Sequence, residues 1–234
     1  MAAPMTERAI ARIRQLIIDG ELRPGSRLPP EQELAALVGS SRNTTREAVR
    51  ALVTARVLDV RRGDGTFVTS LRPELLLDSI GMALDLISDE SHLELLAVRR
   101  VLESAAAELA ARRIGAAGLA ELARLLDLLR DSVGDDENYR KHDAAFHAVI
   151  SRHCGNATLT ALLGSLSRRT VRVDPPRGVA DIAAQREGVG QLQVLLEALG
   201  SGDAALAAAA ATVHVAAAEA AARKVLAETG RSTR

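Results

Sequence analysis

The chain has 234 residues, a length that favours two domains over one. Its 30 basic and 30 acidic side chains balance, and 47% of its residues are apolar, which excludes a disordered tail and a uniformly basic coat protein. Cys154 is the one cysteine, so neither an internal disulfide framework nor a cysteine-rich zinc site is possible, and we expect a cytoplasmic protein. No signal-peptide core is present, and the alanine-rich stretch 204–211 is too short to span a membrane.

The first part of the sequence predicts three helices in succession. Apolar residues recur at helical spacing over 7–19. A second helix is expected to begin at Pro30, because proline is favoured at a first helical position, and to end at Gly39. Ser41 is placed to cap a third helix over 42–55. A tight turn between two such helices is typical of DNA-binding proteins.

A β-hairpin is expected after the third helix. The β-prone segments 57–61 and 66–69 flank the turn Gly63-Asp64-Gly65. Three helices followed by a two-stranded hairpin make a winged helix-turn-helix. Up to residue 70 the chain has eleven basic and eight acidic side chains, whereas the remainder has nineteen and twenty-two. The excess positive charge therefore belongs to the winged-helix part.

The rest of the chain predicts helices without convincing strands. They are expected, with turn residues between them, over 74–87, 91–114, 118–131, 136–153, 156–170, 179–199 and 203–228. This pattern indicates an all-α antiparallel helical bundle. The protein is thus expected to be mainly α, with a DNA-binding domain over 1–70, a linker and connecting helix over 71–91, and a helical domain over 92–234.

The third predicted helix carries side chains suited to the major groove. Arg42 and Arg46 are four residues apart, and Thr45 lies beside Arg46, so two guanidinium groups and a hydroxyl are expected to be exposed together. At the hairpin, Arg62 next to Gly63 offers charge and a closely approaching backbone to phosphates or to the minor groove. The alternative is that these arginines only solvate the surface.

Four sequence blocks occur in order within residues 7–69. They read LRPGSRLP at 22–29, EQELA at 31–35, SRNTTREAV at 41–49 and RRGDGTFV at 61–68. Together they resemble the GntR family of transcription regulators. The resemblance implies a homodimer on double-stranded operator DNA, with contacts from Gln32, Arg42, Thr44, Thr45, Arg46, Arg62 and Gly63. Pro30 departs from the family pattern, in which a small N-capping residue is usual, so a side-chain cap is lost.

Three further motifs lie in the helical part. They are VRRVLE at 98–103, DAAFH at 143–147 followed by Gly155-Asn156, and Gly202-Asp203 with a later His214. These motifs resemble the FCD ligand-binding domain of the FadR-type branch of the GntR family. The four-residue spacing of Asp143 and His147 also puts a carboxylate and an imidazole on one helix face, as a shared metal requires, and His214 would add a third ligand.

The resemblance implies a divalent metal such as zinc in the helical domain. Metal-binding members of the branch have one more histidine, and the corresponding position here is Leu192, so the ligand set is incomplete. Water, an effector, Gln191 or Gln193 are candidates to complete it. The alternative is that Asp143, His147 and His214 form a hydrogen-bonded polar cluster inside the bundle.

Arg99 matches the arginine that binds the effector carboxylate in the family. An ion pair with Glu103, four residues later, is the alternative for this side chain. We therefore expect a regulator rather than an enzyme: a repressor released from a palindromic operator by a small organic acid, without a membrane partner. A dimeric scaffold whose bundle binds no effector, and a metal-dependent hydrolase, are the competing interpretations.

Overall fold

The computed structural model describes residues 4–77, 89–170 and 181–232. The chain divides into two compact units, Met1–Ser79 and Ile80–Arg234, which we describe separately. Of the helix expected over 74–87, the described residues contain α4 (Pro73–Leu76), and the part from residue 78 onward lies outside them.

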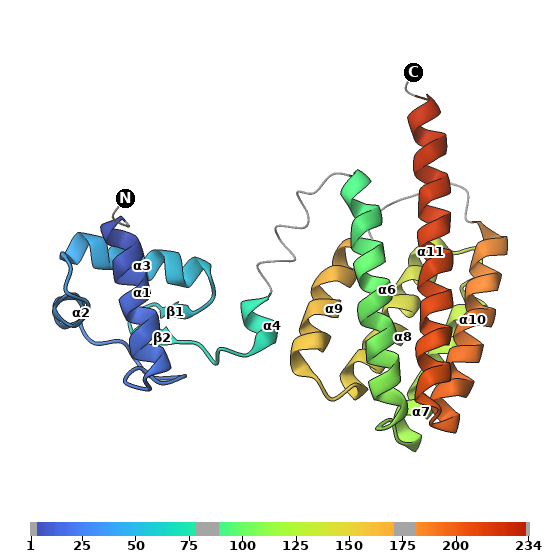
Figure 1. The fold of residues 1–234 in the computed structure, drawn as a ribbon, viewed down its shortest axis with the longest axis horizontal. Helices are drawn as coiled ribbons and strands as arrows, with labels where there is room; N and C mark the ends of the chain where they lie inside the picture. Colours follow the sequence, from blue (N-terminus) through green and yellow to red (C-terminus); the bar gives the residue numbers. More distant parts are fainter. Residues whose placement is uncertain (1–3, 78–88, 171–180, 233–234) are drawn as a thin grey trace. The chain divides into compact units, whose positions relative to one another are not determined.

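The first unit is a winged helix-turn-helix (Figure 1). It contains, in chain order, α1 (Met5–Ile18), α2 (Glu31–Val38), α3 (Arg42–Thr54), β1 (Leu58–Arg61) and β2 (Gly65–Val68). The two strands pair antiparallel, with Leu58 opposite Val68 and Arg61 opposite Gly65. Three helices and a two-stranded wing confirm the predicted fold of this part.

Capping residues fix the turn between α2 and α3. Gly39 ends α2 with a φ of 69°, a left-handed conformation that glycine adopts without strain. The Ser41 hydroxyl accepts the backbone N–H of Thr44 at 3.1 Å and caps α3. The expectation that α2 begins at Pro30 is wrong by one residue: Pro30 is the N-cap, because its ψ of 148° is extended, and it offers no side-chain cap.

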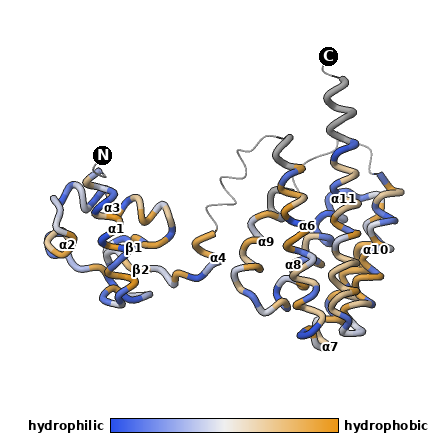
Figure 2. Tube along the Cα trace, in the orientation of Figure 1, coloured by the Kyte–Doolittle hydropathy of each residue, from blue (hydrophilic) through white to orange (hydrophobic). Residues whose placement is uncertain are grey.

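Aliphatic side chains from all three helices and the wing form one small core (Figure 2). Ile13 and Leu16 of α1 and Leu58 at the start of the wing are 1% exposed or less. Burying large aliphatic groups of this kind supplies most of the stability of a domain without aromatic core residues. The core fixes α3 against α1 and leaves the opposite face of α3 free.

The second unit is a helical bundle, as predicted. Its helices are α6 (Asp89–Ala111), α7 (Ala116–Asp131), α8 (Asp136–His153), α9 (Ala157–Thr170), α10 (Ile182–Ser201) and α11 (Ala204–Ser232). Helices α6 and α11 run antiparallel side by side, and the Ser104 hydroxyl of α6 donates to the Ala208 carbonyl of α11 at 3.1 Å. Helix α10 begins at Ile182 rather than at 179, with Asp181 as its N-cap; residues 179 and 180 lie outside the described part.

Helix α11 is longer than the alanine-rich stretch seen in the sequence. By length and composition alone, Ala204–Lys224 could cross a membrane. In the structure this segment packs against α6 and α10, and it carries two buried polar side chains, His214 and Glu219. The core accounts for only part of its apolar character, because Leu206 and Val213 of the same segment are exposed.

Candidate functional site

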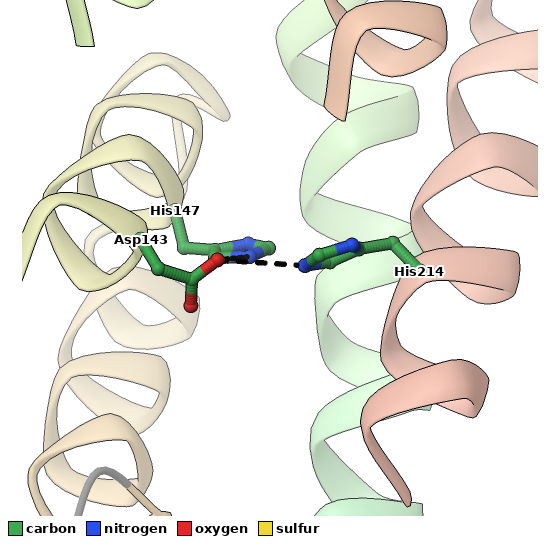
Figure 3. A group of neighbouring side chains, drawn as sticks. All are labelled: Asp143, His147 and His214. Atoms are coloured by element: carbon green, nitrogen blue, oxygen red, sulfur yellow. Dashed lines mark ion pairs between the residues drawn. The ribbon is translucent and has the colours of Figure 1, made fainter. Parts of the chain in front are cut away.

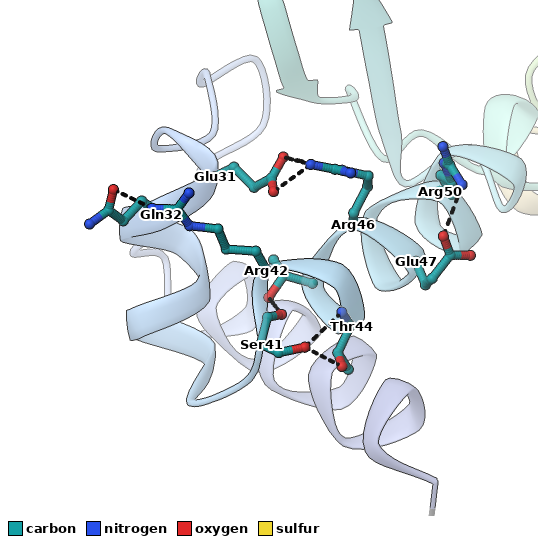
Figure 4. Close-up of polar contacts among 9 residues, drawn as sticks. Glu31, Gln32, Ser41, Arg42, Thr44, Arg46, Glu47 and Arg50 are labelled. Carbon is teal, nitrogen blue, oxygen red and sulfur yellow. Dashed lines mark hydrogen bonds and ion pairs between the residues drawn. The ribbon is translucent and has the colours of Figure 1, made fainter.

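The exposed face of α3 carries arginines that are held by side chains of α2 (Figure 4). Arg42 Nη2 donates to Gln32 Oε1 at 2.6 Å. Arg46 pairs with Glu31 at two points: Nη2 lies 2.8 Å from Oε1, and Nε lies 3.3 Å from Oε2. The structure thus brings together Gln32, Arg42 and Arg46, three of the residues predicted to contact operator DNA. It adds Glu31, which the sequence analysis did not single out because the partners are fifteen residues apart.

Thr45 is the one member of the predicted DNA-contact set on α3 that is buried. Its side chain is fully buried, and its hydroxyl lies 2.8 Å from Ser40 Oγ and donates to the Ser41 carbonyl at 3.0 Å. The expectation of a free Thr45 hydroxyl is therefore wrong. The physical reason is helical phase, because position 45 shares its face with Ala48 and Leu52, which belong to the core.

Thr44 lies on the outer side of the same turn. It is half-buried, and its hydroxyl lies 2.8 Å from Ser41 Oγ. The polar N-terminal turn of α3 thus presents Ser41, Arg42 and Thr44 together, with backbone N–H groups that point in the same direction. Such a helix start favours a phosphate group.

The wing presents a charged tip. Arg62 and Gly63 are both exposed, and within the described residues Arg62 has neither a hydrogen bond nor an ion pair. Gly63 has a φ of 78°, and a Cβ there would meet nothing within 4 Å, so its backbone is open to a ligand. The Arg61 guanidinium instead lies 4.2 Å from the Phe67 ring centroid, a cation–π contact that ties it to the wing.

In the second unit, Asp143, His147 and His214 converge (Figure 3). The first two come from α8 and the third from α11. The Nε2 atoms of His147 and His214 lie 3.7 Å and 3.6 Å from the same Asp143 Oδ1. The two imidazole rings are stacked, with centroids 5.1 Å apart. The four-residue spacing on α8 and the late histidine therefore meet at one point, as expected.

Two further side chains orient the histidines from behind. Glu103 Oε2 lies 2.8 Å from His147 Nδ1, and Gln191 Oε1 lies 3.2 Å from His214 Nδ1. Because an amide oxygen can only accept, the Nδ1 atom of His214 carries its proton. Both Nε2 atoms consequently face the Asp143 carboxylate. A partner on the outer ring nitrogen is the usual arrangement around metal-binding histidines.

The cluster attracts positive charge. Burial alone would lower the pKa of His147, but the carboxylates of Glu103 and Asp143 outweigh it and raise that pKa to about 10. Burial would raise the pKa of Glu103, yet His147 and Arg99 bring it down to about 2. The pKa of Asp143 also lies well below its usual range because the two histidines outweigh its burial. A cation, either a proton or a metal, is required between these groups.

Two of the three ligand-atom separations approach those around a zinc-sized ion, and all three atoms lie within 4.8 Å of one another. Ligand atoms about 2.1 Å from a tetrahedral ion lie about 3.4 Å from one another. The observed separations of 3.6 and 3.7 Å are close to this value. Leu192 is fully buried in the apolar core and offers no ligand atom. Gln193 contacts Glu197 and Arg130 instead, at 2.7 Å each, so it does not fill the gap, and Gln191 contacts the far side of the His214 ring.

Arg99 is buried and forms the ion pair with Glu103 that the sequence offered as an alternative. Its Nε donates to Glu103 Oε1 at 2.7 Å. Glu103 therefore joins Arg99 to His147, and the charged groups form one continuous buried network. Tyr139 is a neighbour that the sequence analysis missed: a Cβ on Gly188 would lie 2.6 Å from Tyr139 Oη and 3.8 Å from His214 Cε1. Only a glycine at this point of α10 leaves room for the Tyr139 hydroxyl.

Comparisons with known proteins agree with this geometry. Residues 5–68 match the family "Bacterial regulatory proteins, gntR family", and residues 94–217 match the FCD domain. The chain is 32% identical over 152 residues to the HTH-type transcriptional regulator LutR of Bacillus subtilis, covering 65% of this chain and 69% of that protein. It is 28% identical over 210 residues to the galactonate operon transcriptional repressor of Escherichia coli, covering 88% and 92%. A solved structure of Streptococcus agalactiae GntR superimposes with a TM-score of 0.66 at 27% identity, covering 92% and 99%.

An arginine-bearing helix beside a wing, followed by a helical bundle with a buried polar cluster, defines a DNA-binding transcription regulator with a separate ligand-binding domain. The chain belongs to the GntR family and carries an FCD domain, as its sequence motifs predicted. Regulators of this family are not enzymes, so the hydrolase interpretation is not favoured, and neither is a scaffold without an effector site.

Proposed function

We propose that this chain is a cytoplasmic repressor that binds a palindromic operator as a homodimer and is released by a small carboxylate. One of the relatives named above supports this proposal by its description: it is a repressor, and its operon is named for galactonate, a sugar acid. Two-fold symmetry would place two α3 helices about one DNA turn apart. The exposed arginine face of α3 is the observation that carries the DNA-binding part.

For operator contacts we propose the exposed or half-buried members of the predicted set. They are Gln32, Arg42, Thr44, Arg46, Arg62 and Gly63. The guanidinium groups have N–H pairs that match guanine or phosphate oxygens. Thr45 supports the helix-turn-helix from inside, because its hydroxyl is already bonded to the turn at Ser40 and Ser41.

For the bundle we propose that Asp143, His147 and His214 hold a divalent metal such as zinc. Three ligands leave open coordination positions, and a bound metal would supply a Lewis-acidic positive charge for an effector carboxylate. Glu103 and Gln191 would hold the two imidazoles in the orientation that presents Nε2. Arg99, which is paired with Glu103, is proposed to bind the effector carboxylate through its guanidinium group.

Binding of the purified full chain to DNA tests the proposal. The probes are duplexes covering the DNA that flanks its own gene, titrated at several salt concentrations. We expect salt-sensitive, sequence-dependent binding of one dimer per duplex. Binding that is equal for all duplexes of the same length, or that is absent at micromolar protein, would refute the repressor function.

A further inference from the structure

Two of the three arginines of α3 are held by consecutive residues of the preceding helix α2. Glu31 and Gln32 form the first turn of α2, and they contact Arg46 and Arg42 respectively. Arg50, one turn further along α3, pairs instead with Glu47 of its own helix at 2.8 Å. Among the described residues, the side-chain hydrogen bonds between the two helices therefore involve Arg42 and Arg46, in the first half of α3.

Glu31 occupies one particular edge of the Arg46 guanidinium. Its carboxylate contacts Nε and Nη2, the side edge of the planar group. Nη1 has no hydrogen bond or ion pair among the described residues. The end edge, formed by Nη1 and Nη2, still has two outward N–H groups, and this fork matches the O6 and N7 acceptors of guanine.

A carboxylate on this surface opposes general attraction to DNA. Glu31 is 41% exposed and its negative charge lies beside the basic face of α3, so it weakens the sequence-independent pull of the phosphates. Exposed ion pairs also contribute little to folding stability. An acidic side chain in this place therefore has its main effect on how Arg46 meets DNA.

We propose that Glu31 is a positioning residue that sets the sequence selectivity of the operator contact by fixing Arg46 through its side edge. Held in this way, the guanidinium presents its end edge, Nη1 and Nη2, in one orientation and can contact a guanine. The Arg46 side chain is then less free to turn toward the phosphates. This inference rests on the proposed DNA-reading role of Arg46. On this proposal, Glu31 increases the discrimination between operator and other DNA sequences and lowers the affinity for DNA of any sequence.

The test compares Glu31→Gln with Glu33→Gln in the full chain. Glu33 lies in the same turn of α2 and is exposed, and the structure gives it no hydrogen bond or ion pair among the described residues, so its substitution removes an equal charge without releasing Arg46. The probes are a duplex selected by the wild-type chain from a random pool and a shuffled duplex of the same composition. Circular dichroism confirms that both variants are folded.

Both variants are expected to bind the shuffled duplex more tightly, because each removes a negative charge. Glu31→Gln should lower the ratio of selected to shuffled affinity by about tenfold, within the range for one base contact, whereas Glu33→Gln should change it less than twofold. Among single base-pair changes, Glu31→Gln should relax the same position that Arg46→Ala relaxes.

An equal ratio for Glu31→Gln and Glu33→Gln, with Arg46→Ala still losing selectivity, would overturn the role of Glu31 and leave the DNA-reading surface intact. If Arg46→Ala also keeps the wild-type ratio, Glu31 has no reading residue to position, and the proposed contact at Arg46 is refuted together with this inference.

Discussion

The two units place the same kind of interaction in opposite environments. On α3, the Arg46–Glu31 pair is about half exposed, with side chains 52% and 41% accessible. In the bundle, the Arg99–Glu103 pair is buried, with side chains 11% and 6% accessible, and it continues into His147. Solvent screens the first pair, so it contributes little to the free energy of unfolding. The second pair is shielded from solvent, so neutralising Arg99, Glu103 or His147 changes the electrostatic energy of the other two.

This difference separates two functions. A surface that contacts DNA needs charges that remain accessible to the bases and phosphates. The proposed binding of a metal or a carboxylate in the bundle would need charges that are strongly coupled. The predictions below test whether the exposed and buried clusters behave in these opposite ways.

The largest effect is expected from removing the central charge of the buried network. His147→Leu leaves the Glu103 and Asp143 carboxylates without their shared partner in a buried site. We expect the free energy of unfolding of the bundle to fall by about 3–5 kcal/mol. Urea denaturation in the presence of a chelator measures it, and His153→Leu, a half-buried histidine on the same helix, is the control. A loss under about 1 kcal/mol would show that the network is not strongly coupled.

Zinc should stabilise the bundle by a comparable but smaller amount. At a free concentration of 100 times its dissociation constant, a ligand of the folded state adds about 2.7 kcal/mol. We expect zinc to raise the melting temperature of the wild-type chain and to leave that of His214→Ala nearly unchanged. Differential scanning calorimetry makes the comparison. An equal shift in both proteins would mean that zinc binds elsewhere.

Breaking the exposed pair should hardly affect folding. Arg46→Ala removes a solvent-screened interaction, so we expect the free energy of unfolding to fall by less than about 1 kcal/mol. The same urea experiment measures this change, and Arg50→Ala, which breaks the neighbouring exposed pair, is the matched variant. A loss as large as that of His147→Leu would remove the contrast between the two clusters.

Thr45→Val should have the smallest effect on DNA selectivity. Valine keeps the volume but loses the hydroxyl bonds to Ser40 and Ser41, for an expected cost of about 1 kcal/mol. Because the hydroxyl is buried, the preference for the selected duplex should stay within twofold of wild type. A fluorescence anisotropy titration with that duplex checks the expectation. If Thr45→Val lost the preference for the selected duplex without losing folding stability, Thr45 would have to contact DNA directly.

The sequence predicted those features that depend on short spacing. Gly39 and Ser41 marked the helix-turn-helix, and the Asp143–His147 spacing gave two members of the buried cluster proposed to hold a metal. Partners that are distant in sequence could not be predicted in this way. Glu31 with Arg46, and Gln191 with His214, depend on how the helices pack.

Thr45 shows a different limit. The signal for its burial was present, because it lies three residues before Ala48 and seven before Leu52 on the core face. Its polar side chain favoured the opposite assignment. A hydroxyl can be buried when the backbone of its own helix turn accepts its proton, as the Ser41 carbonyl does here. Helical phase was therefore the better guide than residue polarity.

One titration tests the division between the two clusters most directly. The wild-type chain, Arg46→Ala and His214→Ala are each titrated against the selected and the shuffled duplex at the same salt concentration, without added ligand. We predict that Arg46→Ala weakens binding to the selected duplex by about 1–3 kcal/mol and loses most of its preference, whereas His214→Ala keeps the wild-type preference. Retained selectivity in Arg46→Ala, or an equal loss in His214→Ala, would contradict the account.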